Sequence, residues 1–458
     1  MLGKEIYCNT LYPHYLKVTD QYRKSKYYSG VLSDYLIINP KTDCTSLNDD
    51  SLVGFVPMAN VQEMNNAVSF DLVPYKQVKK GFTVFRKGDL IWAKITPCMQ
   101  NGKSCTTGEM PSEIGFGSTE FHVIRKRTNG IYMPFIWAIL SNSNVLKAAQ
   151  ATFSGSAGQQ RVSPSFIENF PATIPSYSDQ VLMVSKIEQA LEEKNKKLQQ
   201  ANHLLINNAE LVLEKLGLSL SHSAKQLTYC TTYASLTGRI DADYYSPKFS
   251  HFRNQIEATS FPVATVEDIS ERIVSGFAAG KQDQADNLPD DKRVPHLRPF
   301  SITPVGELSF DTMKYVPKGQ LKEEDYCRKN EVLFNNTNSP DLVGKTTVFD
   351  SDILCATSNH MTRITVKDGV NPYYVAAFFN VLLSTGYWKL LCTNFNNQAG
   401  VNTETLKNVR IPLPPKDIQD DIARAIMQRR AKANALRKEA EEEWRTAKEQ
   451  FEKLLLET

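Results

Sequence analysis

The sequence is poor in the residues that build disulfides and metal sites. Its eight cysteines are scattered without a C-x-x-C pair, and none of its seven histidines stands near cysteine or carboxylate residues at metal-ligand spacing. We therefore predict reduced thiols and no metal site. Long hydrophobic runs are also missing, and the N-terminal residues lack the apolar stretch of a signal peptide. These absences predict a cytoplasmic protein without a membrane partner.

The motifs of common catalytic sites are missing as well. The chain contains no G-x-G-x-x-G, G-x-x-x-x-G-K-[ST], H-E-x-x-H or G-x-S-x-G. Gly344-Lys345-Thr346 ends like a phosphate-binding loop, but Ser339 takes the place of its first glycine. Asn371-Pro372-Tyr373-Tyr374 resembles the Asn-Pro-Pro-Tyr motif of amino-methyltransferases without its second proline, and helix capping explains its Asn-Pro. We therefore predict no catalytic residue on this chain.

The composition is that of a globular protein. Hydrophobic residues make up 41% of the chain and charged residues 22%, which separates it from disordered sequences. A net charge of +3 neither favours nor excludes nucleic acid. Residues 72–88 carry five basic side chains and no acid, and residues 125–127 are all basic. Such patches are typical of phosphate contacts, and equally of solvated lysines at strand ends.

A long internal repeat organises the chain. Residues 130–189 align with residues 369–428 at a constant offset of 239, without a gap. Both copies contain an apolar helix-like run, a loop rich in Gly, Asn and Gln, a proline-flanked strand and a long polar helix. The identical pairs are Gly130/Gly369, Ala138/Ala377, Gln159/Gln398, Val162/Val401, Asn169/Asn408, Pro175/Pro414, Gln180/Gln419, Ile187/Ile426 and Gln189/Gln428. A period this long indicates two tandem domains rather than a solenoid.

The repeat continues upstream at an offset of 242. Residues 86–92 match residues 328–334 in a pattern of basic pair, turn, acid and three apolar residues, which predicts a turn that leads into a buried strand. Gly102-Lys103 matches Gly344-Lys345. Further upstream we match Val56-Pro57 with Val294-Pro295, and Asn39-Pro40-Lys41 with Ser246-Pro247-Lys248, although the spacing drifts there.

We predict a mixed α/β (α+β) fold built twice. The domains are expected at residues 1–176 and 225–416, each followed by a long helix, at 177–217 and 418–458. Within the domains, residues 134–151 and 372–391 have the length and apolar spacing of helices. Prolines at each domain exit restrict the backbone and hold the start of the following helix in a defined direction.

The two long helices carry narrow apolar stripes with coiled-coil-like spacing. Such a stripe needs a partner, so we expect the helices to pair antiparallel with each other; an independent coiled-coil stalk is the alternative. The predicted helix–helix contacts are Val184, Ile187, Leu191 and Leu198 in the first helix and Ile422, Ile426, Ala433 and Leu436 in the second.

Several segments resemble the target-recognition domains of type I restriction-modification specificity subunits. They are residues 88–99, Asn101-Gly102-Lys103, residues 117–123, Val294-Pro295-His296-Leu297-Arg298-Pro299, and Ile411-Pro412-Leu413-Pro414-Pro415 leading to Gln419. The order of domain, helix, domain, helix covers the whole chain. The second copy departs from the pattern where Ala356-Thr357-Ser358-Asn359-His360 replaces the Gly-Ser-Thr-Glu-Phe segment.

The resemblance implies a non-catalytic subunit whose two domains each read one half of a bipartite site on double-stranded DNA. The helices would set the gap and dock two adenine-N6 methyltransferase subunits, which restriction/translocase subunits would join. No cofactor is expected on this chain; S-adenosylmethionine, ATP and Mg would bind to the partner subunits. The alternatives are a recognition subunit or fusion partner of another methyltransferase or restriction system, and a coiled-coil scaffold that does not bind DNA.

Two matched loops are the predicted DNA contacts. Residues 155–161 and 394–400 are rich in glycine and amides, and amide and basic side chains read base edges and phosphates. Such loops are also simply flexible turns. The candidates are Gln159, Gln160, Arg161, Asn396, Asn397 and Gln398, with Lys94, Lys103, Arg298 and Lys345 in support.

Overall fold

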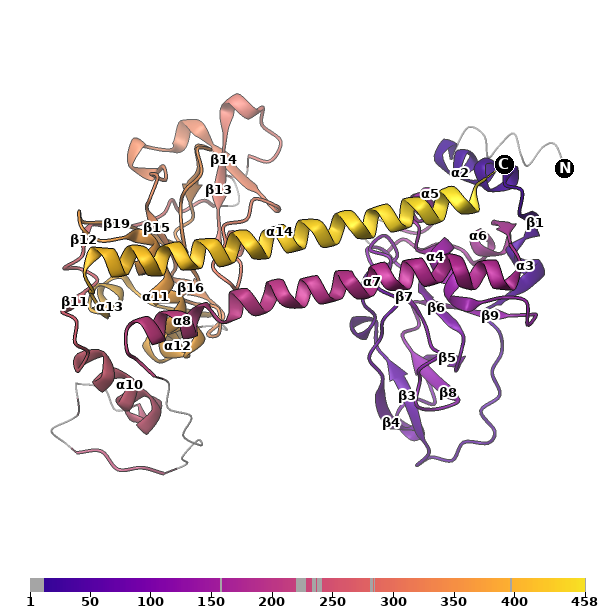
Figure 1. Cartoon of the computed structure of the whole chain (residues 1–458), viewed down its shortest axis with the longest axis horizontal. Coiled ribbons are helices and arrows are strands. Elements are labelled where there is room, and N and C mark those ends of the chain that lie inside the picture. Colours follow the sequence, from indigo (N-terminus) through magenta and orange to yellow (C-terminus); the bar gives the residue numbers. More distant parts are fainter. Residues whose placement is uncertain are drawn as a thin grey trace. The chain divides into compact units, whose positions relative to one another are not determined.

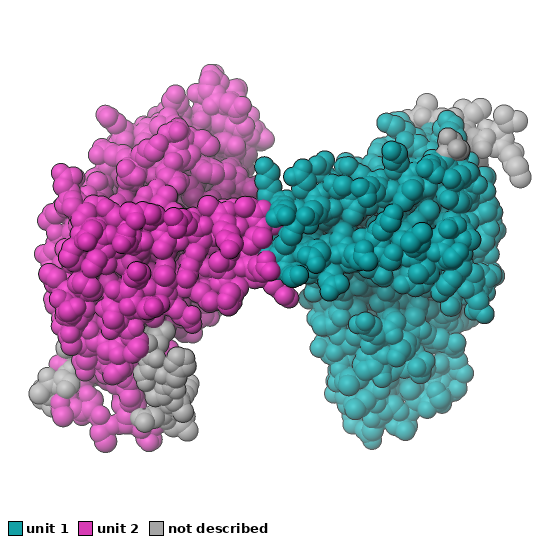
Figure 2. Space-filling view, in the orientation of Figure 1, with its two compact units in different colours: residues 1–198, 438–458 teal, residues 199–437 magenta. Residues whose placement is uncertain are grey.

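The computed structural model describes residues 12–156, 159–219, 228–232, 236, 241–280, 283, 285–395 and 398–457. The chain forms two compact units (Figure 2): unit 1 comprises residues 1–198 with 438–458, and unit 2 comprises residues 199–437. The long helices α7 (Tyr177–Ile206) and α14 (Lys416–Leu455) therefore each contribute to both units. No helix among the described residues has the length and apolarity that crossing a membrane requires.

Unit 1 contains a four-stranded sheet of order β2-β9-β6-β7, a second of order β4-β3-β8-β5 and a two-stranded sheet of β1 and β10 (Figure 1). Strands β3 and β8 pair in parallel, and the other neighbours are antiparallel. The elements are α2 (Pro13–Lys24), β1 (Tyr28–Val31), α3 (Leu32–Tyr35), β2 (Leu36–Ile38), β3 (Leu52–Val56), β4 (Asp71–Pro74), β5 (Thr83–Arg86), β6 (Leu90–Ala93), β7 (Ser104–Thr106), β8 (Ile114–Gly117), β9 (Phe121–Lys126), α4 (Met133–Leu140), α5 (Ser143–Ala151), α6 (Pro164–Glu168) and β10 (Pro171–Thr173).

Unit 2 repeats this topology. Its sheets have the orders β12-β19-β15-β17, β14-β13-β18 and β11-β22, and a further sheet has the order β16-β21-β20. The elements are α8 (Asn208–Lys215), α9 (Ala242–Tyr245), α10 (Pro247–Glu257), β11 (Val263–Thr265), β12 (Ser270–Ser275), β13 (Arg293–Leu297), β14 (Lys314–Pro317), β15 (Val332–Asn335), β16 (Thr337–Asn338), β17 (Thr346–Val348), β18 (Ala356–Thr357), β19 (Met361–Val366), α11 (Pro372–Ser384), α12 (Tyr387–Leu391), β20 (Thr393–Phe395), β21 (Gln398–Gly400), α13 (Thr403–Lys407) and β22 (Arg410–Pro412). The predicted mixed α+β fold, built twice, is confirmed.

Strand register corrects the upstream part of the sequence alignment. In the parallel pairs, Val56 lies opposite Gly117 and Leu297 lies opposite Thr357, so Val56 corresponds to Leu297 and not to Val294. Pro247 begins α10 as Pro13 begins α2, because proline is well tolerated in the first turn of a helix. The match of Asn39-Pro40-Lys41 with Ser246-Pro247-Lys248 is therefore wrong.

Three predicted helices are each divided in two. Residues 134–151 form α4 and α5, and the side chain of Asn142 caps α5 by accepting a hydrogen bond from the backbone N–H of Asn144 at 2.8 Å. Residues 372–391 form α11 and α12, separated at Gly386, whose φ of +80° suits glycine. The first long helix ends at Ile206, and α8 begins after a turn at Asn207.

The acid in the repeated turn before β6 and β15 has a structural role. Asp89 Oδ2 accepts a hydrogen bond from the backbone N–H of Arg86 at 2.7 Å, and Glu331 Oε2 accepts one from Arg328 at 2.9 Å. Asp89 also binds the guanidinium of Arg125 through both of its oxygens, at 2.7 and 2.8 Å. Since Asp89 and Glu331 are buried, these bonds satisfy charges that would otherwise be costly.

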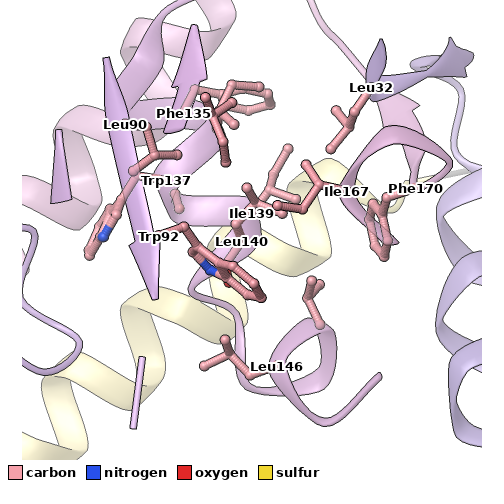
Figure 3. Packing of buried hydrophobic residues seen from close by; sticks show 14 of the residues in the cluster. Leu32, Leu90, Trp92, Phe135, Trp137, Ile139, Leu140, Leu146, Ile167 and Phe170 are labelled. Carbon is pink, nitrogen blue, oxygen red and sulfur yellow. The ribbon is translucent and has the colours of Figure 1, made fainter. Parts of the chain in front are cut away.

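The main core of unit 1 packs β6 against α4, α5 and α6 (Figure 3). Its two large indoles keep their polar edges bonded: Trp92 Nε1 donates to the carbonyl of Leu140, and Trp137 Nε1 donates to that of Ser104. The same core includes Trp444, Phe451 and Leu455 from the last part of α14. This part of α14 therefore helps to complete the core of unit 1.

A repeated glutamine attaches each long helix to its domain. Gln180 Oε1 accepts from the backbone of Tyr132 at 2.9 Å, and its Nε2 donates to the carbonyls of Gly130 and Pro175 at 3.0 Å. Gln419 Oε1 accepts from the backbone of Asn371 at 2.9 Å, and its Nε2 donates to the carbonyl of Pro414 at 2.8 Å. Both side chains are buried, so the start of each helix has a defined position on its own domain.

Within each unit the long helices lie antiparallel. In unit 1, Lys194 pairs with Glu441 at 2.8 Å and Lys197 pairs with Glu439 at 2.9 Å, so the sequence numbers run in opposite directions along the two helices. In unit 2, Arg429 donates to the backbone carbonyl of Asn207 at 2.8 Å.

The stripe residues divide between core and helix contacts. Val184 and Ile187 are buried in the unit 1 core beside residues of α14, Leu191 packs against that core, and Leu198 is half-buried. Ile422 and Ile426 are buried with Val212 and Leu213 in the core of unit 2, and Ala433 and Leu436 lie with Ala201 and Leu205. At the beginning of each long helix the apolar face is therefore wider than a coiled-coil seam, because this part packs on a domain as well as on the other helix.

Candidate nucleic-acid interface

In unit 1, three chain segments meet just after β6. The backbone N–H of Lys94 donates to the carbonyl of Glu120 at 2.9 Å, and the N–H of Val162 donates to the carbonyl of Lys94 at 3.0 Å. The N–H of Thr96 donates to the carbonyl of Gln160 at 3.0 Å. Segment 94–96 thus lies between Glu120 and the predicted reading loop, and it brings Lys94 together with Gln160 and Arg161.

Each nitrogen of the Arg161 guanidinium donates one hydrogen bond within this junction. Its Nε and Nη2 donate to the two carboxylate oxygens of Glu120 at 2.9 and 2.7 Å, and its Nη1 donates to the backbone carbonyl of Gln159 at 2.9 Å. The hydrogen bond from Arg161 lowers the pKa of the Glu120 carboxyl, which is therefore ionised at neutral pH. We call this bidentate ion pair the clasp.

Amide and cationic groups surround the clasp. Gln159 is exposed, whereas Gln160 and Lys94 are half-buried. Gln100 Oε1 accepts a hydrogen bond from Thr96 Oγ1 at 2.5 Å, which orients its amide next to the same segment. Amides present the paired donor and acceptor that base edges require, and Lys94 supplies a charge for phosphate. Ala157 and Gly158 lie outside the described residues.

Unit 2 builds the equivalent junction with different side chains. The backbone N–H of Asn336 donates to the carbonyl of His360 at 3.1 Å, and Val401 donates to the carbonyl of Asn336 at 2.9 Å, as their counterparts do in unit 1. The Asn336 amide turns inward and donates to Thr362 Oγ1 at 2.9 Å. Gln398 is exposed in β21. Asn396 and Asn397 lie outside the described residues, so their predicted contact with DNA stays a prediction.

The two matched lysines predicted to support DNA binding each donate hydrogen bonds to backbone carbonyls of their own unit. Lys103 Nζ donates to the carbonyl of Met58 at 3.2 Å. Lys345 Nζ donates to the carbonyls of Pro299 and Ile302 at 2.7 and 2.5 Å. Lys345 is only 4% exposed, and burial lowers the pKa of its ammonium group. Each lysine therefore holds the turn after β3 or β13 in place. The assignment of Lys345 as a DNA contact is wrong because its ammonium group is buried, whereas Lys103 is half-buried and its role as a DNA contact stays a prediction.

Lys345→Met should lower the free energy of unfolding of unit 2 by about 1–3 kcal/mol, because a buried carbonyl at Ile302 and a half-buried one at Pro299 lose their donor. It should leave the salt dependence of DNA binding unchanged, since no phosphate contact is lost. Urea unfolding and binding titrations at several salt concentrations measure the two effects. A salt slope that becomes shallower by about one unit would restore Lys345 as a phosphate contact.

The basic patches are partly neutralised. Lys76 pairs with Asp50 at 2.9 Å and Lys79 pairs with Asp49 at 3.0 Å, so neither is a free cation. Exposed basic side chains without an ion pair among the described residues remain at Lys80, Arg86, Lys87, Lys126 and Arg127. Arg298 is half-buried directly after β13, and no described carboxylate pairs with it. It therefore stays a candidate for a phosphate or a base.

The burial of a histidine next to Arg298 escaped the sequence analysis. His296 is 2% exposed on β13, where its ring lies against the backbone of Phe277 and Thr357. Burial, with Arg298 adjacent, lowers the pKa of His296 to about 4. Its counterpart in unit 1 is Phe55, by the strand register given above. The family resemblance includes His296, but its burial was not predicted, because the other copy has an apolar residue there.

The stability of unit 2 should fall as the pH falls from 6.5 to about 4. His296 stays neutral in the folded chain over this range, whereas the unfolded chain binds a proton, so protonation favours unfolding. The loss should reach about 3 kcal/mol near pH 4. His296→Phe, which copies unit 1, should flatten this dependence in urea unfolding followed at several pH values. An equally steep dependence in the variant would contradict the assignment.

Comparison with known proteins identifies the family. The type I restriction modification DNA specificity domain matches residues 32–203 and again residues 265–443, which together make up more than half of the chain. The chain belongs to this family. The two matches coincide with the duplication and include both junctions described above. Among the described residues, no group of three or more His, Cys, Asp or Glu side chains is arranged to hold a metal ion.

Curated relatives share parts of the sequence. The specificity subunit of the type I restriction enzyme EcoAI from Escherichia coli is 33% identical over 192 residues, which are 42% of this chain and 32% of that protein. The EcoEI specificity subunit from Escherichia coli is 26% identical over 316 residues, 66% of this chain and 50% of that protein. The chain thus spans half or less of the length of these relatives.

A solved structure shares the fold. A chain from work on complex assembly and conformational transition of the type I R-M system matches with a TM-score of 0.51 and 16% sequence identity. The match covers 93% of this chain and 95% of that chain. At this identity the likeness shows the fold alone.

Proposed function

We propose that this chain is a non-catalytic DNA sequence-specificity subunit, in which each unit reads one half of a bipartite site. One observation carries the proposal: the framework is repeated, while the side chains at the reading junction are not. Lys94, Glu120 and Arg161 in unit 1 correspond to Asn336, His360 and Gly400 in unit 2. Two recognition junctions with the same backbone framework but different side chains would recognise two different half-site sequences.

The partners follow from the family. The chain would act in the cytoplasm on double-stranded DNA, together with two adenine-N6 methyltransferase subunits and with restriction/translocase subunits. S-adenosylmethionine, ATP and Mg would bind to those subunits and not to this chain. The named relatives are specificity subunits of type I restriction enzymes, which supports this assignment.

The helices would set the gap between the half-sites. A heptad inserted into both helices, between Gln199 and Gln200 and between Arg437 and Lys438, adds about 10 Å of helix. At 3.4 Å for each base pair, the unspecified gap should grow by about three base pairs. The chain is coexpressed with its methyltransferase, and the N6-methyladenine positions are mapped by sequencing.

Two controls make this test decisive. A heptad placed in α7 alone should abolish methylation, because it destroys the register of pairs such as Lys194 with Glu441. A conservative change at an exposed position of the same helix, Lys196→Arg, should leave the gap as it is. A double insertion that methylates DNA with an unchanged gap would contradict the role of the helices.

A further inference from the structure

We infer that the clasp between Glu120 and Arg161 is a specificity-positioning device, which holds the reading loop of unit 1 in place and keeps Arg161 away from DNA. The inference rests on the proposed function and deepens it for one loop. It changes the role of Arg161 from a direct DNA contact, as the sequence analysis predicts, to a residue that acts through the loop beside it.

The clasp crosses over the central segment of the junction. Glu120 and Arg161 lie 41 positions apart, and segment 94–96 runs between their backbones. Arg161 forms an isolated bridge with Ile95 and another with Ser154, so the ion pair and the backbone bonds fix the same end of the loop. A bidentate carboxylate–guanidinium pair fixes orientation as well as distance, which a single hydrogen bond does not.

Unit 2 fixes the equivalent loop without charges. Gly400 stands at the position of Arg161, and β21 pairs with both β16 and β20. Thr337 lies opposite Gly400 and Asn338 lies opposite Ala399 in this sheet. Unit 2 thus has a three-stranded sheet where unit 1 has two isolated bridges and the ion pair. The C-terminal end of the loop is held in both units, which argues that its position matters to both readers, while only unit 1 uses an ion pair there.

The half-exposed position of the clasp gives it a second effect. The Arg161 side chain is 40% exposed and the Glu120 side chain 24%, so both are near solvent and near any bound polyanion. While paired, Arg161 uses three of its five N–H groups on Glu120 and Gln159, so the bidentate edge formed by Nε and Nη2 is not available to a base. Without Glu120, the same guanidinium becomes a free cation that attracts phosphate regardless of sequence.

Two single variants should therefore share one effect and differ in another. Glu120→Ala and Arg161→Ala each release the loop, so discrimination at one or more positions in one half of the methylated motif should fall about tenfold. The other half, read by unit 2, should not change. Only Glu120→Ala frees a cation, so only this variant should steepen the plot of log affinity against log salt, by about 0.9.

The experiment uses the complete chain in complex with its methyltransferase. N6-methyladenine mapping gives the motif, and binding to duplexes at several salt concentrations gives the slope. The swapped double variant, Glu120→Arg with Arg161→Glu, rebuilds the pair and should recover most of the lost discrimination with a wild-type slope. Asp49→Ala, which breaks a surface ion pair with Lys79 elsewhere in unit 1, is the matched control and should leave the motif unchanged.

Each other outcome overturns the inference. An unchanged motif in both single variants would show that the clasp does not position the reader. Equal relaxation of both half-sites, or failed assembly that the swapped pair does not rescue, would show a general folding role. A shallower slope in Arg161→Ala, by about 0.9, would make Arg161 a phosphate contact. A wild-type complex without a two-part motif would instead overturn the proposed function itself.

Discussion

Gly344→Ala should destabilise unit 2 by about 4 kcal/mol, because the added methyl group strains the backbone dihedral angles and also overlaps a packed side chain. The φ of Gly344 is +97°, which residues with a Cβ rarely adopt, and an added Cβ would lie 2.1 Å from Cδ1 of Trp388. The Trp388 side chain cannot easily move away from the added methyl group. It is fully buried, packs against Phe334 and Phe379, and donates from Nε1 to the carbonyl of Phe379 at 2.8 Å.

Gly369→Ala separates the two conflicts. Gly369 has a similar φ of +84°, but an added Cβ would meet nothing within 4 Å, so only the backbone cost of roughly 1 kcal/mol applies. Trp388 is the single tryptophan of residues 199–437, and urea unfolding followed by its fluorescence, against a background without the other tryptophans, reports on unit 2. If both variants lost the same free energy of unfolding, the side chains around Gly344 would have to move aside without cost.

Phe451→Ala should cost unit 1 about 4 kcal/mol, although the residue belongs to the last helix of the chain. Phe451 is 4% exposed in the main core of unit 1, where its ring lies edge-on to that of Phe135 with centroids 5.8 Å apart. The backbone beyond it is held as well, since Ser25 Oγ donates to the carbonyl of Leu455 at 2.6 Å. Truncation leaves a cavity and loosens these contacts together.

Met427→Ala on the same helix is the matched control. Met427 is 46% exposed, so its loss should change stability by less than about 0.5 kcal/mol. Hydrogen exchange read peptide by peptide distinguishes the units: in Phe451→Ala, amides of α4 and β6 should exchange faster while those of α11 do not. Protection that persists in α4 would mean that α14 only rests on unit 1 and does not complete its core.

The repeat predicted the topology because its identities mark framework contacts. Gln180 and Gln419 are identical since each accepts from the backbone N–H just before α4 or α11 and donates to a proline carbonyl at the exit of its domain. Gly102 and Gly344 are identical since both have a positive φ. Patterns that arise from local geometry were therefore readable from the sequence, including the turn acids Asp89 and Glu331.

The site itself was only partly predictable. Lys345 looked like a phosphate contact, because a sequence does not show that its acceptor Pro299 lies 46 positions away in the chain. The partnership of Glu120 with Arg161 spans a similar distance, so the loop was found and the role of its arginine was not. The break at Asn207 was also missed, although Asn208 interrupts the apolar stripe there, because a polar residue in a stripe does not by itself end a helix.

The most direct test of the whole account is a map of N6-methyladenine in DNA from cells that express this chain with its methyltransferase partner and no other specificity subunit. The account predicts one motif in two parts, with a fixed unspecified gap and a different sequence in each part, since the two reading junctions differ. A continuous motif, or unmethylated DNA although the assembled methyltransferase is active, would contradict it.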